Sequence, residues 1–334
     1  MTTLSANTLT LGDRVRRSNP DGTIVSMITE TMDQFNGMSN DARWFEGELP
    51  GGHQGTYRSS LPAWATINPN GTGGTAKSTT GQNLETTEYI QAIMEFHEIV
   101  GNYGGDVSGL QASETPAFVQ GGMQTVSSRL IYGNGTTTPG QITGIMARYN
   151  SLTTGNNARN VVDGGALAGQ TDCMSVLFMD WGQGKVSGFY PQGSKGGFEM
   201  VNHGRRIKDV SATTQQVVYT IQFKQGIGLA VDNWTSVVRV ANIDKSLLVA
   251  GTGADLFDKF IVAKHKLSRG AASKTRGIYL NSTTDMMLDI QARNDVIAGG
   301  GLTYINVNGE DVKAWRGIPL NIEDQLTESE TVVS

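Results

Sequence analysis

Three short segments of the chain carry residue types that could do chemistry, and each lacks a part that the chemistry requires. Residues 97–101 (HEIVG) begin like the zinc-protease motif, but glycine stands where the second histidine ligand belongs. Residues 180–185 (DWGQGK) end like a phosphate-binding loop, but a glycine is missing at the required spacing and Val186 replaces the Ser or Thr that holds magnesium. Residues 306–309 hint at a calcium loop without its carboxylates. We therefore expect no metal ion and no cofactor.

No pattern in the sequence supplies an activated nucleophile. The chain has no Gly-x-Ser-x-Gly elbow, and its single cysteine, Cys173, has no histidine beside it in the sequence. We expect Cys173 to be structural, and one cysteine excludes an intramolecular disulfide and a site of several thiolates. The sequence therefore predicts no catalytic residue and a protein that is not an enzyme. A cytosolic enzyme whose site forms only in three dimensions stays open as an alternative.

Two basic stretches stand out against this background. The first follows the polar face of a predicted helix and its exit loop, and consists of Lys259, Lys264, His265, Lys266, Arg269, Lys274 and Arg276. The second is shorter and consists of Arg205, Arg206 and Lys208. Such runs are usually the solvated face of an element. Contact with a partner or with a nucleic-acid backbone is the alternative.

The composition describes a chain that is low in charge and rich in glycine. Among 334 residues, 43 are glycine, 17% are Asp, Glu, Lys or Arg, and the net charge is −5. Ordinary globular proteins have about 25% charged residues, and a soluble monomer normally spreads them over its surface. Either part of this surface is buried against other chains, or neutral polar side chains solvate a monomer. The acidic balance argues against a basic nucleic-acid reader.

Nothing in the sequence directs the chain to a membrane. No apolar run approaches the length of about 18 residues that a membrane-spanning helix needs. The first residues lack the basic region and the sustained apolar run of a signal peptide. The apolar share of 38% is enough to bury a core. We expect an intracellular, globular protein.

Apolar periodicity predicts two helices in the middle of the chain. The first carries Ile90, Ile93, Met94, His97 and Val100 on one face. The second runs from Ser113 to Tyr132, with Ser113 or Thr115 as its cap, Gly133 after its end, and a stripe of Val119, Met123, Val126 and Leu130. Gly121 and Gly122 each cost about 1 kcal/mol inside a helix. They either allow close approach of another backbone or mark a bend.

A glycine-rich segment from Leu49 to Gln82 reads as a long β-hairpin. Its main large apolar residues are Leu61, Trp64 and Ile67, which are too few for a core of its own. Because a lone two-stranded hairpin is marginally stable in water, we expect this one to lie on something else. A disordered linker is the alternative.

Strands dominate after Cys173. We expect a hairpin of residues 175–179 and 186–190, strands at 215–223 and 235–243, and a hairpin of 302–307 with 311–320 around Asn308-Gly309. Amphipathic helices are expected at 256–267 and 285–292. Helices and strands mix without βαβ regularity, which favours an α+β fold.

An ordered set of segments resembles one known family. It comprises Leu130–Asn134, Ala147–Leu152, Asn160–Asp163, Phe189–Gly196, Trp234–Asp244, Ala298–Tyr304 and Arg316–Pro319. Together they resemble the major capsid proteins of short-tailed double-stranded-DNA phages of the epsilon-fifteen type, from about residue 8 to the C-terminus. The resemblance implies the capsid fold of tailed phages and herpesviruses.

That fold divides the subunit into named parts. Residues 1–48 would be an N-terminal arm, and residues 49–86 the extended β-hairpin called the E-loop. Residues 87–334 would be a peripheral domain, with a spine helix at about 113–132, interleaved with an axial domain at about 171–213 and 271–318. Candidate assembly contacts on these parts are Arg14, Arg16, Arg17, Tyr57, Arg58, Trp64, Gly121 and Gly122.

The resemblance also implies the function. The protein would self-assemble, as pentamers and hexamers, into the icosahedral shell that encloses the phage DNA. Its partners would be further copies of itself, a scaffolding protein, a portal and a decoration or cement protein. Packaged DNA would make weak, non-specific contact, because an acidic subunit attracts it little, and the genome could therefore slide during packaging and exit. It would be located in the virion after assembly in the bacterial cytoplasm. A β-rich binding or tail module is a further alternative.

Overall fold

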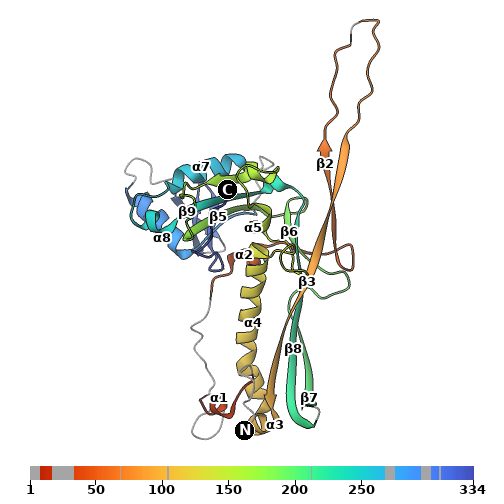
Figure 1. The fold of residues 1–334 in the computed structure, drawn as a ribbon, viewed down its shortest axis with the longest axis vertical. Coiled ribbons are helices and arrows are strands. Elements are labelled where there is room, and N and C mark those ends of the chain that lie inside the picture. The colour runs from red at the N-terminus through yellow and green to blue at the C-terminus, as the bar shows by residue number, and fades with distance from the viewer. Residues whose placement is uncertain are drawn as a thin grey trace. The chain divides into compact units, whose positions relative to one another are not determined.

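A computed structural model describes residues 8–16, 34–67, 69–103, 105–211, 213–267, 275–294, 302–307 and 310–334, and the statements below concern these residues. The helices are α1 (Leu11–Arg16), α2 (Gly37–Asp41), α3 (Glu98–Asn102), α4 (Val107–Tyr132), α5 (Ile145–Arg148), α6 (Lys245–Val249), α7 (Leu256–Lys266) and α8 (Ser282–Asn294), with 3-10 turns η1 (Asn157–Asn160) and η2 (Trp234–Ser236). The strands are β1 (Trp44–Glu46), β2 (Gly52–Ser60), β3 (Thr79–His97), β4 (Val161–Asp163), β5 (Cys173–Asp180), β6 (Val186–Tyr190), β7 (Glu199–Ser211), β8 (Thr214–Val231), β9 (Val237–Asp244), β10 (Arg276–Leu280), β11 (Leu302–Val307), β12 (Glu310–Trp315) and β13 (Ile318–Ile322). The fold is α+β, as the sequence predicts (Figure 1).

The chain forms two compact units. Unit 1 consists of Met1–Gln34, Tyr89–Val126 and Lys195–Gly226, and unit 2 of Phe35–Glu88, Ser127–Ser194 and Ile227–Ser334. Strands β3 and β8 and helix α4 each contribute residues to both units. Each unit has its own buried apolar cluster.

The centre of unit 2 is a sheet with the strand order β11-β12-β13-β10-β5-β9-β4. Its middle strands, β5 and β9, pair antiparallel, and every residue of both is buried. Helices α7 and α8 contribute Phe260 and Leu288 to the core cluster. The ring of Phe260 packs edge-on against Phe178 and Trp315, with centroids 5.1 and 5.6 Å away. Strands that are covered on both faces read as continuous apolar runs, which is why 173–180 and 237–244 are visible in the sequence.

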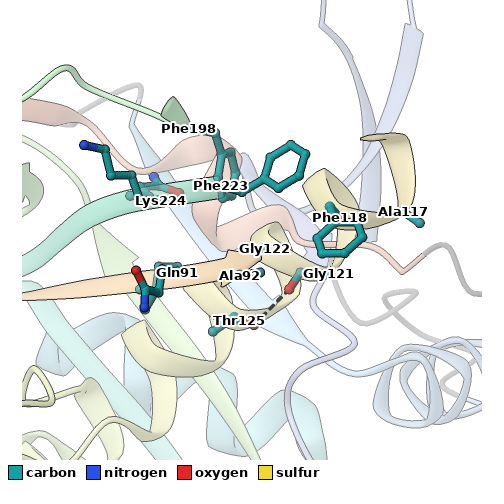
Figure 2. Close-up of a pocket in the computed structure, with 12 residues that line it drawn as sticks. Gln91, Ala92, Ala117, Phe118, Gly121, Gly122, Thr125, Phe198, Phe223 and Lys224 are labelled. Atoms are coloured by element: carbon teal, nitrogen blue, oxygen red, sulfur yellow. Dashed lines mark hydrogen bonds between the residues drawn. The ribbon is translucent and has the colours of Figure 1, made fainter. Parts of the chain in front are cut away.

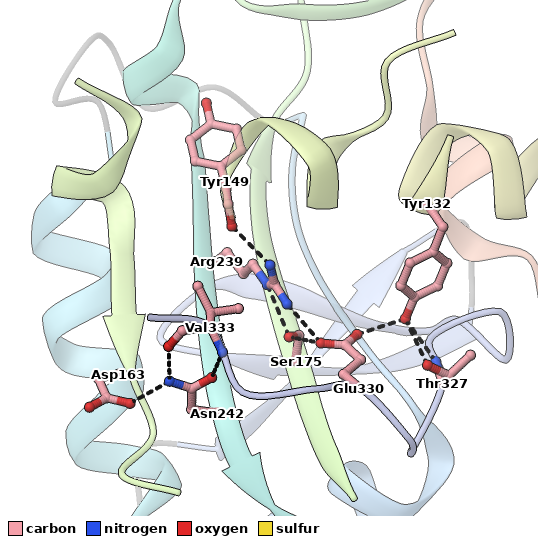
Figure 3. Close-up of polar contacts among 9 residues, drawn as sticks. All are labelled: Tyr132, Tyr149, Asp163, Ser175, Arg239, Asn242, Thr327, Glu330 and Val333. Atoms are coloured by element: carbon pink, nitrogen blue, oxygen red, sulfur yellow. Dashed lines mark hydrogen bonds and ion pairs between the residues drawn. The ribbon is translucent and has the colours of Figure 1, made fainter. Parts of the chain in front are cut away.

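A buried ion pair lies in this sheet and ties down the C-terminal segment (Figure 3). Arg239 of β9 is 4% exposed, and its Nη2 donates to Glu330 Oε2 at 2.8 Å. The same guanidinium donates to the Ser175 hydroxyl at 3.1 Å and to the Tyr149 carbonyl at 2.8 Å. Tyr132, the last residue of α4, donates to Glu330 Oε1 at 2.6 Å. The hydrogen bonds of this one buried ion pair therefore join Arg239 of β9 to β5, the segment after α5 and the C-terminal segment, and Glu330 to the end of α4.

Backbone pairing extends this attachment. Glu330 exchanges both backbone hydrogen bonds with Cys173, and the amide of Asn242 bonds Val333 through both of its ends, at 2.8 and 2.9 Å. Asn242 has a φ of +59°, a left-handed conformation that asparagine tolerates better than most residues. Residues 330–334 thus behave as a further edge of the unit 2 core rather than as a tail.

The predicted hairpin of residues 175–179 and 186–190 is wrong in its pairing, although both strands exist. Strand β5 pairs with β9 and β10, whereas β6 pairs with β1 and with the last part of β8. Between them Gly182 and Gly184 have φ values of +151° and +72°. The glycine turn redirects the chain from one sheet to another, which the two-strand pattern cannot distinguish from a hairpin.

The predicted helix over residues 90–100 is also wrong. Residues up to His97 belong to β3, and only Glu98–Asn102 are helical. In unit 1, Met94 and Phe96 lie two residues apart on β3, and both belong to the core cluster, with Ile221 and Phe223 of β8. The apolar residues fit both a 3.6-residue and a two-residue period, and pairing with β8 decides between them.

Helix α4 begins six residues before the predicted start, at Val107 rather than Ser113. Asp106 supplies the cap, because its Oδ1 accepts the Gly109 N–H at 2.7 Å. The predicted caps are inside the helix, where the Ser113 and Thr115 hydroxyls donate back to the Leu110 and Gln111 carbonyls. Of the predicted stripe, Val126 and Leu130 are buried, whereas the unit 1 core is reached by Val107, Leu110 and Phe118.

The other predicted strands and helices are present, although some of their ends differ, and strand β7 (Glu199–Ser211) was not predicted. Strand β8 continues to Val231, α7 and α8 occupy their predicted positions, and β11 pairs antiparallel with β12. The second strand of that last hairpin is divided by a turn at Arg316-Gly317 into β12 and β13. Asn308 and Gly309 lie outside the described residues.

We predict that Glu330→Ala destabilises the subunit by about 3–5 kcal/mol, since it leaves the buried Arg239 charge without a partner. The double variant Arg239→Met/Glu330→Ala should recover much of this loss, because no charge then remains. Urea unfolding of the unassembled subunit measures the free energy of unfolding of the single and the double variant. Equal stability of Glu330→Ala and the unchanged protein would contradict the assigned role.

A second prediction concerns pH. Glu323 is fully buried and accepts the Met38 N–H at 2.9 Å, and burial raises the pKa of its carboxyl to about 7. Because the folded state holds this proton more tightly than the unfolded state, whose carboxyl has the ordinary pKa of about 4.3, stability should fall as pH rises from about 4.5 to 7. Glu323→Gln should remove this slope, measured as unfolding free energy against pH. If the unfolding free energy of Glu323→Gln keeps the same dependence on pH, groups other than Glu323 cause that dependence.

Candidate assembly surfaces

The hairpin of β2 and the first part of β3 exposes both of its faces. The strands pair antiparallel from Gly52↔Thr86 to Ser60↔Thr79. From Thr56 to Ser60 every residue of β2 is exposed, Tyr57 among them at 48%. Beyond β2 the apolar side chains stand almost fully in solvent: Leu61 is 77%, Trp64 97% and Ile67 58% exposed. The hairpin therefore has no core of its own.

Charged contacts hold the base of the hairpin within unit 2. Arg148 donates to Glu85 Oε1 and Oε2 at 2.7 and 2.5 Å. The Nε of Arg129 lies 3.0 Å from Glu88 Oε1, and the Ile142 N–H donates to Glu88 Oε2 at 3.1 Å. Both carboxylates are more than nine-tenths buried. Strand β3 is thus held at Glu85 and Glu88, near the base of the hairpin, whereas its first residues, from Thr79, lie at the far end.

The other strand of the hairpin is fixed by His53. Its ring is 7% exposed, stands edge-on to Phe45 with centroids 4.9 Å apart, and places Nε2 3.7 Å from Asp232 Oδ1. Burial raises the pKa of the Asp232 carboxyl, and the nearby His53 works against that shift. These residues line a cavity of about 720 Å³ that also has Arg43, Glu48 and Arg58 in its wall.

The sequence analysis missed all these base contacts, since each joins residues that are far apart in the chain. Arg148 was the only one of them inside a segment that carries the family resemblance. Of the predicted contacts, Tyr57 and Arg58 lie on β2 and Trp64 in the segment that follows it, and all three are exposed. The Tyr57 ring covers Gly81 of β3, where a Cβ atom would lie 2.8 Å from it.

Gly121 and Gly122 lie beside an apolar cavity of about 280 Å³ in unit 1 (Figure 2). A Cβ atom on Gly122 would lie 2.4 Å from the Phe198 ring, so this glycine makes room for a side chain of the same subunit. A Cβ atom on Gly121 would meet nothing within 4 Å. Helix α4 runs through both positions without interruption. The close approach is therefore intramolecular at Gly122, and the open surface is at Gly121.

The three N-terminal arginines differ in their surroundings. Arg14 is fully buried, and its Nη1 donates to the Asp106 carbonyl at 3.1 Å within unit 1. Arg16 is exposed, with its Nη1 3.9 Å from Asp13 Oδ1. Arg17 lies outside the described residues. Arg16 is therefore the one of the three whose side chain is shown to be accessible.

The shorter basic stretch is compensated by acidic partners. Arg205 pairs with Glu98 at 3.0 Å, Lys208 pairs with Glu95, and Arg206 contacts His203. In the longer stretch, Lys266 donates to the Val161 carbonyl and Arg276 pairs with Asp180. Arg269 and Lys274 lie outside the described residues.

The segments first considered for chemistry have structural roles. His97 caps α3, with its Nδ1 accepting the Ile99 N–H at 3.1 Å. Cys173 is 1% exposed, and burial, with the charges of neighbouring carboxylates, raises the pKa of its thiol to about 11. Over the described residues, no group of three or more His, Cys, Asp and Glu side chains could hold a metal ion. No helix in the same part of the chain is long and apolar enough to cross a membrane.

Comparison with known proteins identifies a protein family and solved structures with a similar fold. The family model for the major capsid protein GP7 matches residues 19–334. A chain in the near-atomic structure of bacteriophage Epsilon15 is 25% identical, with a TM-score of 0.77 over 99% of each chain. The capsid of bacteriophage JBD30 is 7% identical over 90% of this chain and 94% of that chain, with a TM-score of 0.48. A search of curated protein sequences finds no match.

The match to the family model spans almost the whole chain and includes both compact units. The Epsilon15 structure agrees with the same fold over the full length. The predicted resemblance, the absence of an enzymatic role and the location in the virion are thereby confirmed. The chain belongs to the GP7 family of major capsid proteins, which are structural proteins of the bacteriophage shell.

Proposed function

We propose that this protein builds an icosahedral shell from pentamers and hexamers, and that its β2–β3 hairpin lies on a neighbouring subunit. The observation that carries this proposal is the exposed hairpin, with Trp64 97% in solvent. Burying a large apolar side chain contributes about 1.5–3 kcal/mol. Leu61, Trp64 and Ile67 would therefore supply a substantial part of a subunit contact.

The arrangement of fixed base and free end suits this role. Glu85 and Glu88 are held by buried ion pairs, so the direction of the strands is set within unit 2. The chain between Glu48 and Glu85 carries Arg58 and Lys77 but no Asp or Glu. A segment with few charges and exposed apolar groups loses little hydration free energy when another subunit covers it.

The remaining parts take the roles that the family resemblance implies. Residues 1–48 would be the N-terminal arm, 49–86 the E-loop and α4 the spine helix of the peripheral domain. At 26 residues and about 1.5 Å per residue, α4 extends about 39 Å. The axial domain would be formed from about 171–213 and 271–318. The open surface at Gly121 would receive an apolar group of a neighbouring copy.

The other partners that the family resemblance implies belong to the same proposal. A scaffolding protein would guide assembly, a portal would occupy one vertex, and a decoration or cement protein would bind outside. The enclosed DNA would contact the shell weakly, since the subunit has a net charge of −5. Arg16, Tyr57 and Arg58, which are exposed, would contribute further subunit contacts.

We predict that Trp64→Ser leaves the subunit folded but weakens assembly. The side chain contacts little in the isolated subunit, so the change in unfolding free energy should stay within about 0.5 kcal/mol. Loss of a buried tryptophan at each contact should raise the concentration at which shells form by tenfold or more. Sedimentation and negative-stain microscopy measure assembly.

Trp64→Phe is the matched control, because it keeps most of the apolar area and should assemble close to normally. Normal shells from Trp64→Ser would contradict the contact at this residue. A clean monomer of the unchanged protein at micromolar concentration and above would contradict the proposed function as a whole.

The two glycines of α4 give a separate prediction. Gly121→Ala should stabilise the subunit by up to about 1 kcal/mol, since it restores helix propensity in open space. Gly121→Leu should fold but assemble poorly, because the larger side chain occupies the proposed contact. Gly122→Ala should lower stability, since its Cβ meets the Phe198 ring. Urea unfolding measures the stability of each variant, and particle counts measure its assembly. Full particle yield from Gly121→Leu would contradict the proposed contact at this residue.

A further inference from the structure

The turn between β12 and β13 has an unexpected residue. Trp315 pairs with Ile318, so Arg316 and Gly317 form a two-residue loop, with φ values of +48° and +81°. Such loops favour Asn-Gly, because both central residues need a positive φ. An arginine at the first position is disfavoured by the backbone. The turn itself gives no reason for arginine at this position.

The side chain of Arg316 covers a buried tryptophan together with a second cation. Its guanidinium carbon lies 5.0 Å from the centre of the Trp315 ring, and the ammonium of Lys264 lies 5.6 Å from the same centre. Lys264 also donates to the Arg316 carbonyl at 3.3 Å. Trp315 is fully buried, whereas Arg316 is exposed. The indole thus holds two cations at the surface of unit 2.

Among the described residues, a further cation, Arg276, is close enough to Lys264 to influence it. Arg276 and Lys185 share the buried Asp180, at 3.2 and 2.9 Å. Within the described parts of the chain, neither Lys264 nor Arg316 makes an ion pair. Burial, and then the charges of Arg316 and Arg276, lower the pKa of Lys264. An acidic chain therefore holds an excess of positive charge at one place.

We propose that Lys264 and Arg316, with Arg276 close by, form a contact site for the phosphodiester backbone of double-stranded DNA. The guanidinium and ammonium groups donate to phosphate oxygens without reading the bases. Charge complementarity favours this polyanion, and so does the sequence from Lys259 to Arg276, which has six Lys or Arg residues and no Asp or Glu. The inference rests on the proposed function, in which the shell encloses DNA.

Two double variants with the same change in net charge test the site. Lys264→Gln/Arg316→Asn removes both cations, and asparagine is the residue that the turn prefers, so the variant should fold. Arg205→Gln/Lys208→Gln is the matched control, because those cations are already paired with Glu98 and Glu95. Arg316→Asn alone provides a second, milder variant.

The measurement is the binding of a labelled 20-base-pair DNA to the unassembled, full-length subunit, followed by fluorescence anisotropy at several salt concentrations. Each phosphate contact contributes about 0.9 to the slope of log K against log salt. The first variant should therefore lose about 2 in this slope, Arg316→Asn about 1, and the control none. Binding should weaken in the same order.

Several results would overturn the proposal. They are no DNA binding by the unchanged subunit at low salt, an unchanged slope in the first variant, or equal losses in both double variants. Polyglutamate that competes as well as DNA at equal charge would identify an acidic polypeptide as the occupant instead. Shell formation by the same variants is scored by microscopy. Normal shells with lost DNA affinity support the site, whereas failure of the unchanged protein to form shells counts against the proposed function only.

Discussion

The buried charge of Arg239 imposes a condition that the rest of unit 2 must meet. A guanidinium in an apolar sheet is tolerated only if it is paired and fully hydrogen-bonded. Here its partners come from β5, the segment after α5 and the C-terminal segment, and Tyr132 of α4 donates to its counter-ion, Glu330. Burial and the neighbouring Glu330 charge also raise the pKa of the Tyr132 hydroxyl, which donates to that carboxylate. The sheet, the end of α4 and the last residues of the chain are thus held in one arrangement.

A rigid unit of this kind can carry an exposed hairpin. The base of the hairpin uses the same device as the core, namely carboxylates buried against arginines. Its far end has the opposite character, with apolar side chains in solvent and no carboxylate between Glu48 and Glu85. If the hairpin lies on a neighbouring subunit as proposed, stability within the subunit and affinity between subunits depend on different residues. A capsid protein needs both, and a low content of charge is compatible with both.

The sequence predicts an element well where its apolar residues fit a single period, either helical or extended. It predicts an element poorly where pairing with a distant strand determines the structure. Strands β5 and β9 are visible as apolar runs, and α7 as an amphipathic helix capped by Asp255. The stretch from Ile90 to His97 fits two periods, and its neighbour β8 settles the matter. The early start of α4 depends on Asp106, a cap that the sequence does offer and that the stripe of apolar residues obscured. Contacts such as Arg239–Glu330, separated by 91 residues, have no local signal.

The long separation of that pair has a consequence for synthesis. A ribosome produces roughly 5–20 residues per second, so about 5–20 s pass between Arg239 and its counter-ion. During that interval the Arg239 charge lacks its counter-ion, so unit 2 is less stable than in the complete subunit. A polypeptide that stops before residue 330 therefore lacks the contacts that Glu330 and Val333 make with β5 and β9. The ion pair that holds the last residues on the sheet of unit 2 therefore forms only when synthesis of the chain is nearly finished.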